Sequence, residues 1–309
     1  MTFIKSCILS NDVETTSIWH NTLSDKTGLK VIREGMPILL DIYEKYGIKS
    51  TFFMVGDMAK KWPEVVKMVS NSGHEIASHG WSHEVDKAFD VLSIEEQIKH
   101  LSKSKKLLED ISGQEVVSFR APALRVNEHT PVALAETGYK FDSSVASQRF
   151  DMFMSFGSLK KMRWLTAPRK PYITDPNSLF RRGSGSIVEI PLSAFVLPYT
   201  STTLRIFPLL TKLQRRFVYL ESTLSGKPVV FDIHPNEFID ESEHIRVVNR
   251  RAKNFVSYLM ADLIRSGLKV KNLGERCGFL YEREMQYFIK KKYTFYTIKD
   301  FGNRMNLYR

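Results

Sequence analysis

The chain has 309 residues, of which 43% are hydrophobic and 26% charged, so it is neither disordered nor collagen-like and can bury a large core. No apolar run approaches the roughly 20 residues of a membrane-spanning helix, and the run from Phe3 to Leu9 is too short for a secretory signal. We therefore expect a soluble, unexported protein, and because Cys7 and Cys277 form no disulfide framework or metal knuckle, a reducing, cytoplasmic compartment. The net charge of +11 favours an anionic partner.

Short β-rich runs alternate with segments of helical period. In chain order, we predict strands at 4–10, 50–55, 75–78, 118–120, 140–142, 186–190, 228–233 and 293–298, and helices at 35–46, 63–72, 93–111 and 247–266. This alternation favours βα units with a mostly parallel sheet, either doubly wound or closed into a barrel. Active residues should then lie at the carboxyl ends of strands. With no repeat or linker to mark a boundary, we expect one domain over residues 1–309.

Two motifs carry carboxylates and imidazoles with the spacing of a site. Asp12 and Glu14 are separated by one residue at the end of the first predicted strand, so both can point to one face of an extended chain. A solvated helix cap explains this pair equally well. His79 and His83 are four residues apart, one helical turn, and can bind one cation, although chance pairs of this kind are common. His74 is out of register with this pair and is interpreted as structural.

Two further motifs end predicted strands. Arg120 precedes Ala121 and Pro122, where its guanidinium can hold a neighbouring carboxylate ionised; a surface arginine before a proline turn is the alternative. His234 follows an apolar strand and precedes Pro235, a position suited to a general acid, or to a satisfied core histidine.

The joint occurrence of these motifs, in this order, resembles the polysaccharide deacetylase family, the NodB-homology or carbohydrate esterase 4 group. The resemblance extends from about residue 8 to 301 and is supported by segments 47–53, 73–79, 138–144 and 188–191. It implies a distorted (β/α)7 TIM-like barrel closed by the strand at 293–298, with the basic part 244–309 completing the barrel.

The resemblance also implies roles for individual residues. Asp12 matches the catalytic base, Arg120 the residue that orients it, and His234 the general acid, while His79 and His83 match metal ligands. Many members have adjacent aspartates where this chain has Asp12 and Val13, so Glu14 is expected as the third ligand, as in an Asp-x-Glu subgroup. Asp142 or Asp151 would tune the catalytic histidine. The implied metal is Zn²⁺, with Co²⁺, Ni²⁺ or Mn²⁺ as alternatives, and the implied reaction is N-deacylation (acetyl or formyl) of an amino sugar.

The positive charge is concentrated late in the chain. Residues 244–309 hold 15 Lys and Arg against 5 Asp and Glu, so +10 of the net +11 lies there. A second basic cluster contains Lys160, Lys161, Arg163, Arg169, Lys170, Arg181 and Arg182. In 201–220, helical spacing of leucines gives an apolar face edged by cations, which suits either an anionic membrane or the barrel core.

These features favour an N-acylated amino sugar or glycan precursor as substrate, carried on a polyprenyl phosphate and handled at the inner membrane face. Two alternatives stay open: a soluble amidohydrolase acting on a small non-sugar amide, and an inactive carbohydrate-binding member. Nucleic acid ranks last because no binding motif is recognisable.

Overall fold

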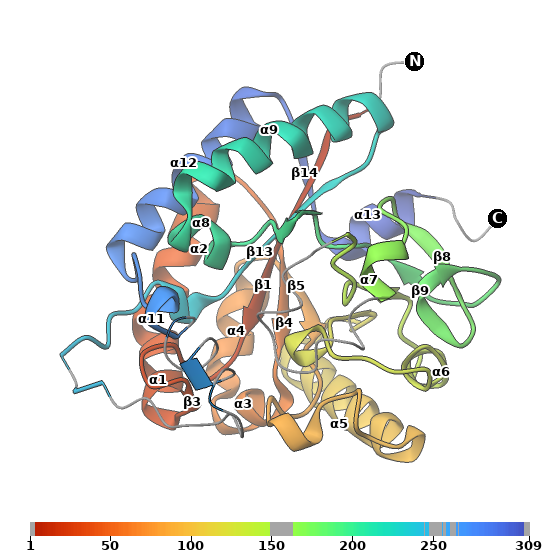
Figure 1. The fold of residues 1–309 in the computed structure, drawn as a ribbon. Coiled ribbons are helices and arrows are strands. Elements are labelled where there is room, and N and C mark those ends of the chain that lie inside the picture. Colours follow the sequence, from red (N-terminus) through yellow and green to blue (C-terminus); the bar gives the residue numbers. More distant parts are fainter. Residues whose placement is uncertain are drawn as a thin grey trace.

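A curled sheet forms the centre of the molecule (Figure 1). The computed structural model describes residues 4–148, 163–243, 245–246, 255, 258–259, 264 and 266–305. Within these, seven strands run parallel in the order β13-β1-β4-β5-β6-β7-β10. They are β1 (Ser6–Val13), β4 (Thr51–Met54), β5 (Glu75–Ser78), β6 (Ser118–Phe119), β7 (Phe141–Asp142), β10 (Val188–Glu189) and β13 (Val229–Ile233). An antiparallel pair, β8 (Tyr172–Asp175) and β9 (Ser178–Arg182), continues the sheet beyond β10.

The two ends of the parallel sheet are joined by the chain that follows β10. The Ser193 amide donates to the Val230 carbonyl, the Val230 amide donates to Ser193 Oγ, and Thr200 forms an isolated bridge with Asp232. The predicted distorted α/β barrel is thereby confirmed. The predicted closing strand exists as β14 (Thr294–Tyr296), but the prediction that it closes the barrel is wrong. It pairs with the start of β1, on the same edge of β1 that pairs with β4 further along the strand.

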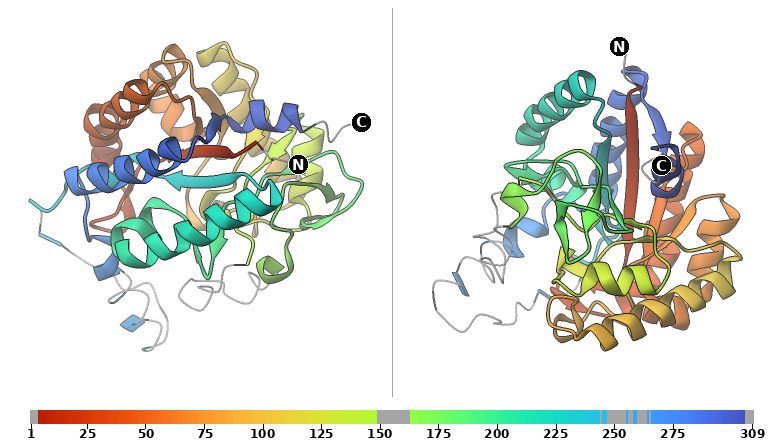
Figure 2. Two further views of the ribbon diagram at one scale, coloured as in Figure 1. Left: turned by 90° about the horizontal axis from the view of Figure 1, so that it is seen from above. Right: turned by 90° about the vertical axis from the view of Figure 1, so that its right-hand side faces the viewer.

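Helices cover the outside of the sheet, and local sequence signals set their ends (Figure 2). Helix α2 (Met36–Tyr46) stops at Gly47, which adopts the left-handed conformation at φ 61°. Helix α5 (Ile94–Ser112) starts with a capping box between Ser93 and Glu96. Among the described residues, the other α-helices are α1 (Asp25–Lys30), α3 (Gly56–Lys61), α4 (Pro63–Asn71), α6 (Thr130–Glu136), α7 (Arg163–Thr166), α8 (Ser201–Ile206), α9 (Pro208–Ser225), α11 (Ser266–Lys269), α12 (Glu275–Lys290) and α13 (Ile298–Arg304).

Short elements complete the connections. A π-helix, η1 (Val31–Gly35), precedes α2, and 3-10 turns occur at η2 (Val85–Lys87), η3 (Pro122–Leu124) and η6 (Pro235–Glu237). Two small antiparallel pairs are β2 (Thr16–Ser17) with β3 (Thr22–Leu23), and β11 (Ala194–Phe195) with β12 (Leu197–Pro198). The helix predicted at 247–266 lies almost wholly outside the described residues. No helix in the described ranges is long and apolar enough to cross a bilayer.

The barrel interior changes from apolar to polar along its strands. Ile8 and Val230 belong to the interior apolar cluster, which also contains Phe53, Phe141 and Val188. Since alternate residues of a strand share a face, the interior side continues from Ile8 through Ser10 to Asp12, and from Val230 to Asp232. The apolar layer therefore seals the amino-terminal half, and buried polar side chains fill the carboxyl ends of β1 and β13.

Candidate active site

The acid pair at the end of β1 lies inside the barrel mouth. Asp12 is in β1 and Glu14 directly follows the strand, and both side chains are buried. Thr16 Oγ1 donates a hydrogen bond to Glu14 Oε2 at 2.8 Å. Because the chain is extended here, the two carboxylates project in the same general direction, as the sequence predicts. They are not a solvated cap.

His79 and His83 come together, although not on a helix as the spacing suggested. Both follow β5 in a loop that turns at Gly80, where φ is 71° and a side chain would collide with Phe89. The two imidazole rings have centroids 5.5 Å apart. His83 Nε2 lies 2.9 Å from Glu14 Oε2, and His79 Nε2 lies 3.8 Å from Asp12 Oδ2. The loop therefore brings both imidazoles to the acid pair.

The tautomer of His79 is set by the backbone just after β6. Its Nδ1 donates to the Arg120 carbonyl oxygen at 2.8 Å, so the lone pair resides on Nε2, which faces the acid pair. Burial lowers the pKa of His79 to about 4, which keeps the imidazole neutral. For His83, burial also opposes protonation, but the Glu14 carboxylate outweighs it and raises the pKa.

Arg120 joins two carboxylates from different strands. This fully buried side chain donates from Nη1 to Asp12 at 2.8 Å and to Asp232, and its Nε donates to the Ser143 carbonyl at 3.0 Å. Burial would raise the pKa of Asp12, but the positive charge of Arg120, with a further contribution from His234, lowers it overall. Asp12 is thereby held as a carboxylate, the state that a general base requires.

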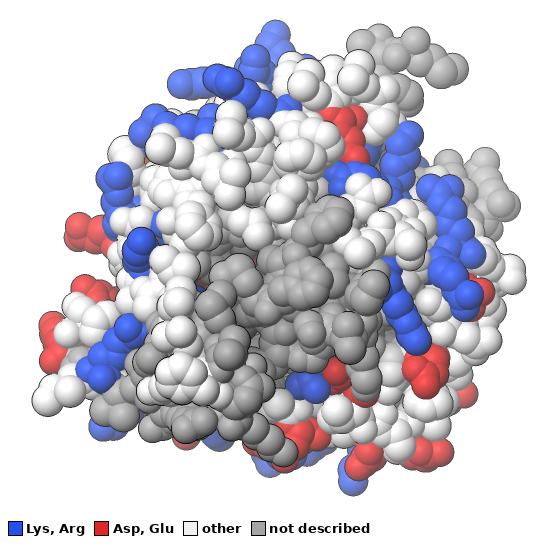
Figure 3. All heavy atoms as spheres, in the orientation of Figure 1, with Lys and Arg blue, Asp and Glu red and all other residues white. Residues whose placement is uncertain are grey.

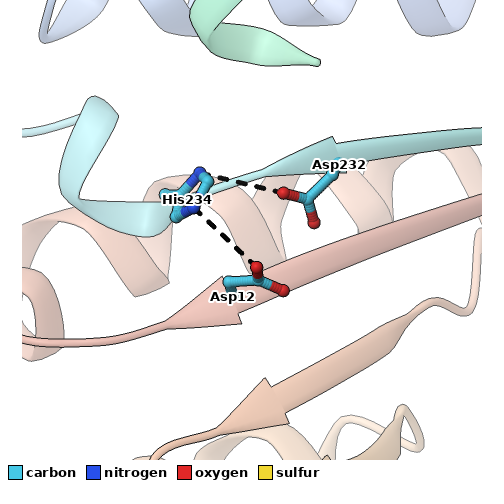
Figure 4. Close-up of side chains that lie close together, drawn as sticks. All are labelled: Asp12, Asp232 and His234. Atoms are coloured by element: carbon cyan, nitrogen blue, oxygen red, sulfur yellow. Dashed lines mark ion pairs between the residues drawn. The ribbon is translucent and has the colours of Figure 1, made fainter. Parts of the chain in front are cut away.

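His234 lies just beyond β13, opposite Asp12 (Figure 4). Its Nε2 is 3.8 Å from Asp12 Oδ2, and its Nδ1 is 3.9 Å from Asp232 Oδ2. Burial lowers the pKa of His234, but the two carboxylates raise it above the ordinary value overall. The pKa of Asp232 is itself raised by burial and by the negative charge of Asp12.

The carboxylate beside His234 is Asp232, to which the sequence assigned no role, and not Asp142. Asp142 lies on β7, across the sheet from β13, where it accepts hydrogen bonds from the amide and hydroxyl of Ser144. Asp151 lies outside the described residues. A signal for Asp232 was present, because it stands two residues before His234 and therefore on the same face of the strand.

Two groups of side chains could be considered for a metal ion. Ligand atoms of Asp12, Asp232 and His234 lie within 4.8 Å of one another. However, Arg120 already places its positive charge between the two aspartates. Two imidazole nitrogens and the Glu14 carboxylate form the other group, a donor set typical of catalytic zinc sites. These three residues have the donor chemistry of a divalent-ion site, and the lone pair on His79 Nε2 is available for it, but only His83 and Glu14 are in contact, while His79 Nε2 lies next to Asp12.

A hollow adjoins the reacting groups. Its lining includes Glu14, His234, Asn236, Arg205, Glu237 and Lys269. Arg205 is held there by a hydrogen bond of 2.8 Å from its Nη2 to Glu237. The hollow therefore continues the site toward polar and cationic side chains.

Part of the chain matches a known protein family. Residues 19–141 match the family model described as polysaccharide deacetylase. A peptidoglycan deacetylase of Helicobacter pylori is 31% identical over 123 residues, which is 40% of this chain and 41% of that protein. The chain thus aligns with less than half the length of this relative.

Solved structures extend the likeness in fold to nearly the whole chain. A protein assigned as a polysaccharide deacetylase from Mycobacterium smegmatis has a TM-score of 0.57 and 23% identity, covering 76% of this chain and 78% of that one. Another protein with that assignment, from Pseudomonas aeruginosa PAO1, has a TM-score of 0.59 and 14% identity over 96% of this chain and 89% of its own.

Proposed function

We propose that this chain, which belongs to the polysaccharide deacetylase family, is a metal-dependent hydrolase that removes an N-acyl group from an amino sugar of a glycan. One observation carries the proposal. His234 Nε2 lies 3.8 Å from Asp12 Oδ2, and the possible metal ligands Glu14, His79 and His83 are next to this pair. A base, an acid and a cation site are the parts used in metal-assisted amide hydrolysis.

The residues have distinct tasks in this reaction. Glu14, His79 and His83 would hold a divalent ion, which when bound supplies electrophilic polarisation and a more acidic water. Asp12, kept ionised by Arg120, removes a proton from the attacking water. His234, whose pKa the neighbouring carboxylates raise, delivers a proton to the departing amine so that the C–N bond breaks. Acetate or formate and a free amino sugar result.

The substrate class follows from the relatives and from the hollow. The relative from Helicobacter pylori is a peptidoglycan deacetylase, and peptidoglycan contains N-acetylated amino sugars. Lys269 lines the hollow that also contains His234, a suitable place for an anionic group of the substrate, while the charge of Arg205 is balanced by Glu237. We therefore propose an N-acylated amino sugar that carries phosphate or carboxylate, with a polyprenyl-phosphate-linked precursor as one such substrate.

The test uses purified protein stripped of metal and reloaded with Zn²⁺, Co²⁺, Ni²⁺ or Mn²⁺. Release of acetate from N-acetylglucosamine oligomers, with and without a pyrophosphate carrier, should depend on the added metal. Asp12→Asn and His79→Ala should each lower turnover by about 10³-fold or more, because each removes a group that acts on the reacting atoms.

Circular dichroism and thermal melting control for folding in both variants. Retained turnover in either folded variant would contradict the proposed roles. Metal-indifferent activity would contradict the metal mechanism, and glycan binding without turnover would identify an inactive carbohydrate-binding member.

A further inference from the structure

Helix α9 has its apolar side turned outward. Its buried residues are Thr211, Gln214, Val218 and Ser222, which are mostly polar or small. The opposite stripe follows helical spacing and contains Leu209, Leu213, Leu220 and Leu224, whose exposed fractions are 76%, 61%, 55% and 77%. The sequence left open whether this apolar face packs in the core. The structure shows that it does not.

The β11–β12 turn enlarges this apolar surface. Phe195 stacks on Phe217 of α9 with ring centroids 4.0 Å apart, and Phe195 and its neighbour Val196 are both about half exposed. Phe207, at the start of α9, and Leu210 are also exposed. We call these side chains together with the leucine stripe the α9 surface. A contiguous apolar patch of this kind typically marks an interaction site.

Cations border the α9 surface on one flank. Lys212 and Arg216 are exposed and one helical turn apart, next to the leucine stripe. Beyond them, the amines of Lys5 and Lys291 lie 5.6 and 5.1 Å from the ring centroid of Tyr219. Figure 3 shows the α9 side of the molecule as a largely uncharged expanse with Lys and Arg side chains along its upper border.

The single acidic residue of α9 does not offset these cations. Glu221 is engaged by Arg169, through two hydrogen bonds, and by Lys227 at 2.9 Å. Its charge is therefore compensated within the protein. The border of the α9 surface thus presents net positive charge next to exposed leucines.

We propose that the α9 surface docks on an anionic lipid membrane, with the leucine stripe entering the lipid boundary and the flanking cations contacting lipid phosphates. Leucines beside Lys, Arg and Tyr are the composition of helices that lie in a membrane interface. A second copy of this chain could bury the leucine stripe against its own, but the flanking cations of the two copies would then repel each other. Charge complementarity therefore favours anionic lipid. This inference concerns the outer face of α9 and does not rest on the proposed catalytic activity.

The experiment is flotation of the purified protein with vesicles of phosphatidylcholine alone or with 30% phosphatidylglycerol, at about 50 and 500 mM salt. We expect binding to the anionic vesicles that falls at high salt, since the surface charges are then screened. Leu213→Glu should abolish binding. The double variant Lys212→Glu with Arg216→Glu should weaken it by about tenfold or more.

Matched variants on other exposed positions separate the α9 surface from general charge effects. Val91→Glu introduces the same change at an exposed apolar position, and Lys67→Glu with Lys99→Glu reverses two exposed cations on α4 and α5. Both should bind as the unaltered protein does. Equal loss in the controls, or no binding to anionic vesicles, would overturn the proposal. Light scattering that shows a dimer dissolved by Leu213→Glu would assign the surface to self-association instead.

Discussion

Asp232→Asn tests whether the second carboxylate sets the protonation of the general acid. In the unaltered protein, Asp232 Oδ2 lies 3.9 Å from His234 Nδ1 and raises the pKa of that imidazole. Asparagine keeps the size of the side chain and removes the charge. His234 should then lose its proton at lower pH, and turnover at neutral to alkaline pH should fall because the leaving amine needs that proton.

The size of the shift follows from distance and surroundings. Two unit charges about 4 Å apart interact by about 1 kcal/mol in water and about 4 kcal/mol at an effective dielectric constant of about 20. The His234 side chain is 26% exposed, and Arg120 already neutralises part of the Asp232 charge. The lower end of the range therefore applies. In Asp232→Asn, the pKa of His234 should fall by about one pH unit, and turnover on the alkaline side should fall by about tenfold.

The assay is the pH dependence of kcat for amine release, and Asp142→Asn is the matched control. Asp142 is also buried, but it bonds to Ser144 on the other side of the sheet. We expect the alkaline limb to move to lower pH only in Asp232→Asn. If both limbs stay in place in Asp232→Asn, or if Asp142→Asn moves the limb instead, the assignment of Asp232 is refuted.

Two further variants test parts of the fold that support the site. His74 is buried, accepts a hydrogen bond from the Ser50 amide at Nδ1, and has its pKa lowered from 6.5 to about 4 chiefly by burial. Since the unfolded state binds the proton more readily, the contribution of neutral His74 to the free energy of unfolding is full above about pH 6.5 and falls by about 3 kcal/mol toward pH 4. In urea unfolding, the stability of His74→Asn should therefore fall less on acidification than that of the unaltered protein. An unchanged dependence of stability on pH would contradict this. In Gly35→Ala, the added methyl group would lie 2.3 Å from the Pro235 carbonyl, next to His234. We expect Gly35→Ala to lower the free energy of unfolding by about 1–3 kcal/mol and to reduce turnover. Gly267→Ala, whose added methyl group meets no described atom within 4 Å, should leave both the free energy of unfolding and turnover unchanged.

The residues that sequence reasoning identified share one property: each stands at or just beyond the end of an apolar strand. Asp12 and Glu14 are placed together by the alternation of one strand, and His234 by the proline that ends another. In these cases local geometry decides where the side chain points. The helical spacing predicted that His79 and His83 lie close together, and they do. The reason differs from the predicted one, because the segment is a loop and not a helix.

Strand order was beyond the reach of local reasoning. Asp142 ends a strand much as the catalytic residues do, but β7 and β13 are separated in the sheet by β1, β4, β5 and β6. Asp232 was overlooked because an acid inside the apolar run 229–233 looks like an interruption of the core. The spacing of two residues puts Asp232 on the same face as His234, and the register opposite Ser10 on β1 then places that face inside the barrel. Similarly, the period of α9 defines an apolar face without stating which side meets the sheet.

The charges around the buried carboxylates predict where a divalent ion would bind. Asp12, Glu14 and Asp232 are three buried carboxylates, and Arg120 compensates charge only on the two aspartates to which it donates. Glu14 instead faces His83, whose neutral form is a good ligand. Binding of an ion should therefore depend on Glu14 and far less on Asp232.

Thermal unfolding with and without Zn²⁺ separates the two possibilities. A ligand at 100 times its dissociation constant stabilises the folded protein by about 2.7 kcal/mol. We expect this gain in the unaltered protein and in Asp232→Asn, where Glu14 and both imidazoles remain. Glu14→Gln should lose most of it, because a neutral amide replaces the only carboxylate of the donor group. If Asp232→Asn lost the gain and Glu14→Gln kept it, the ion would belong between the aspartates, and Arg120 would have to move aside to admit it.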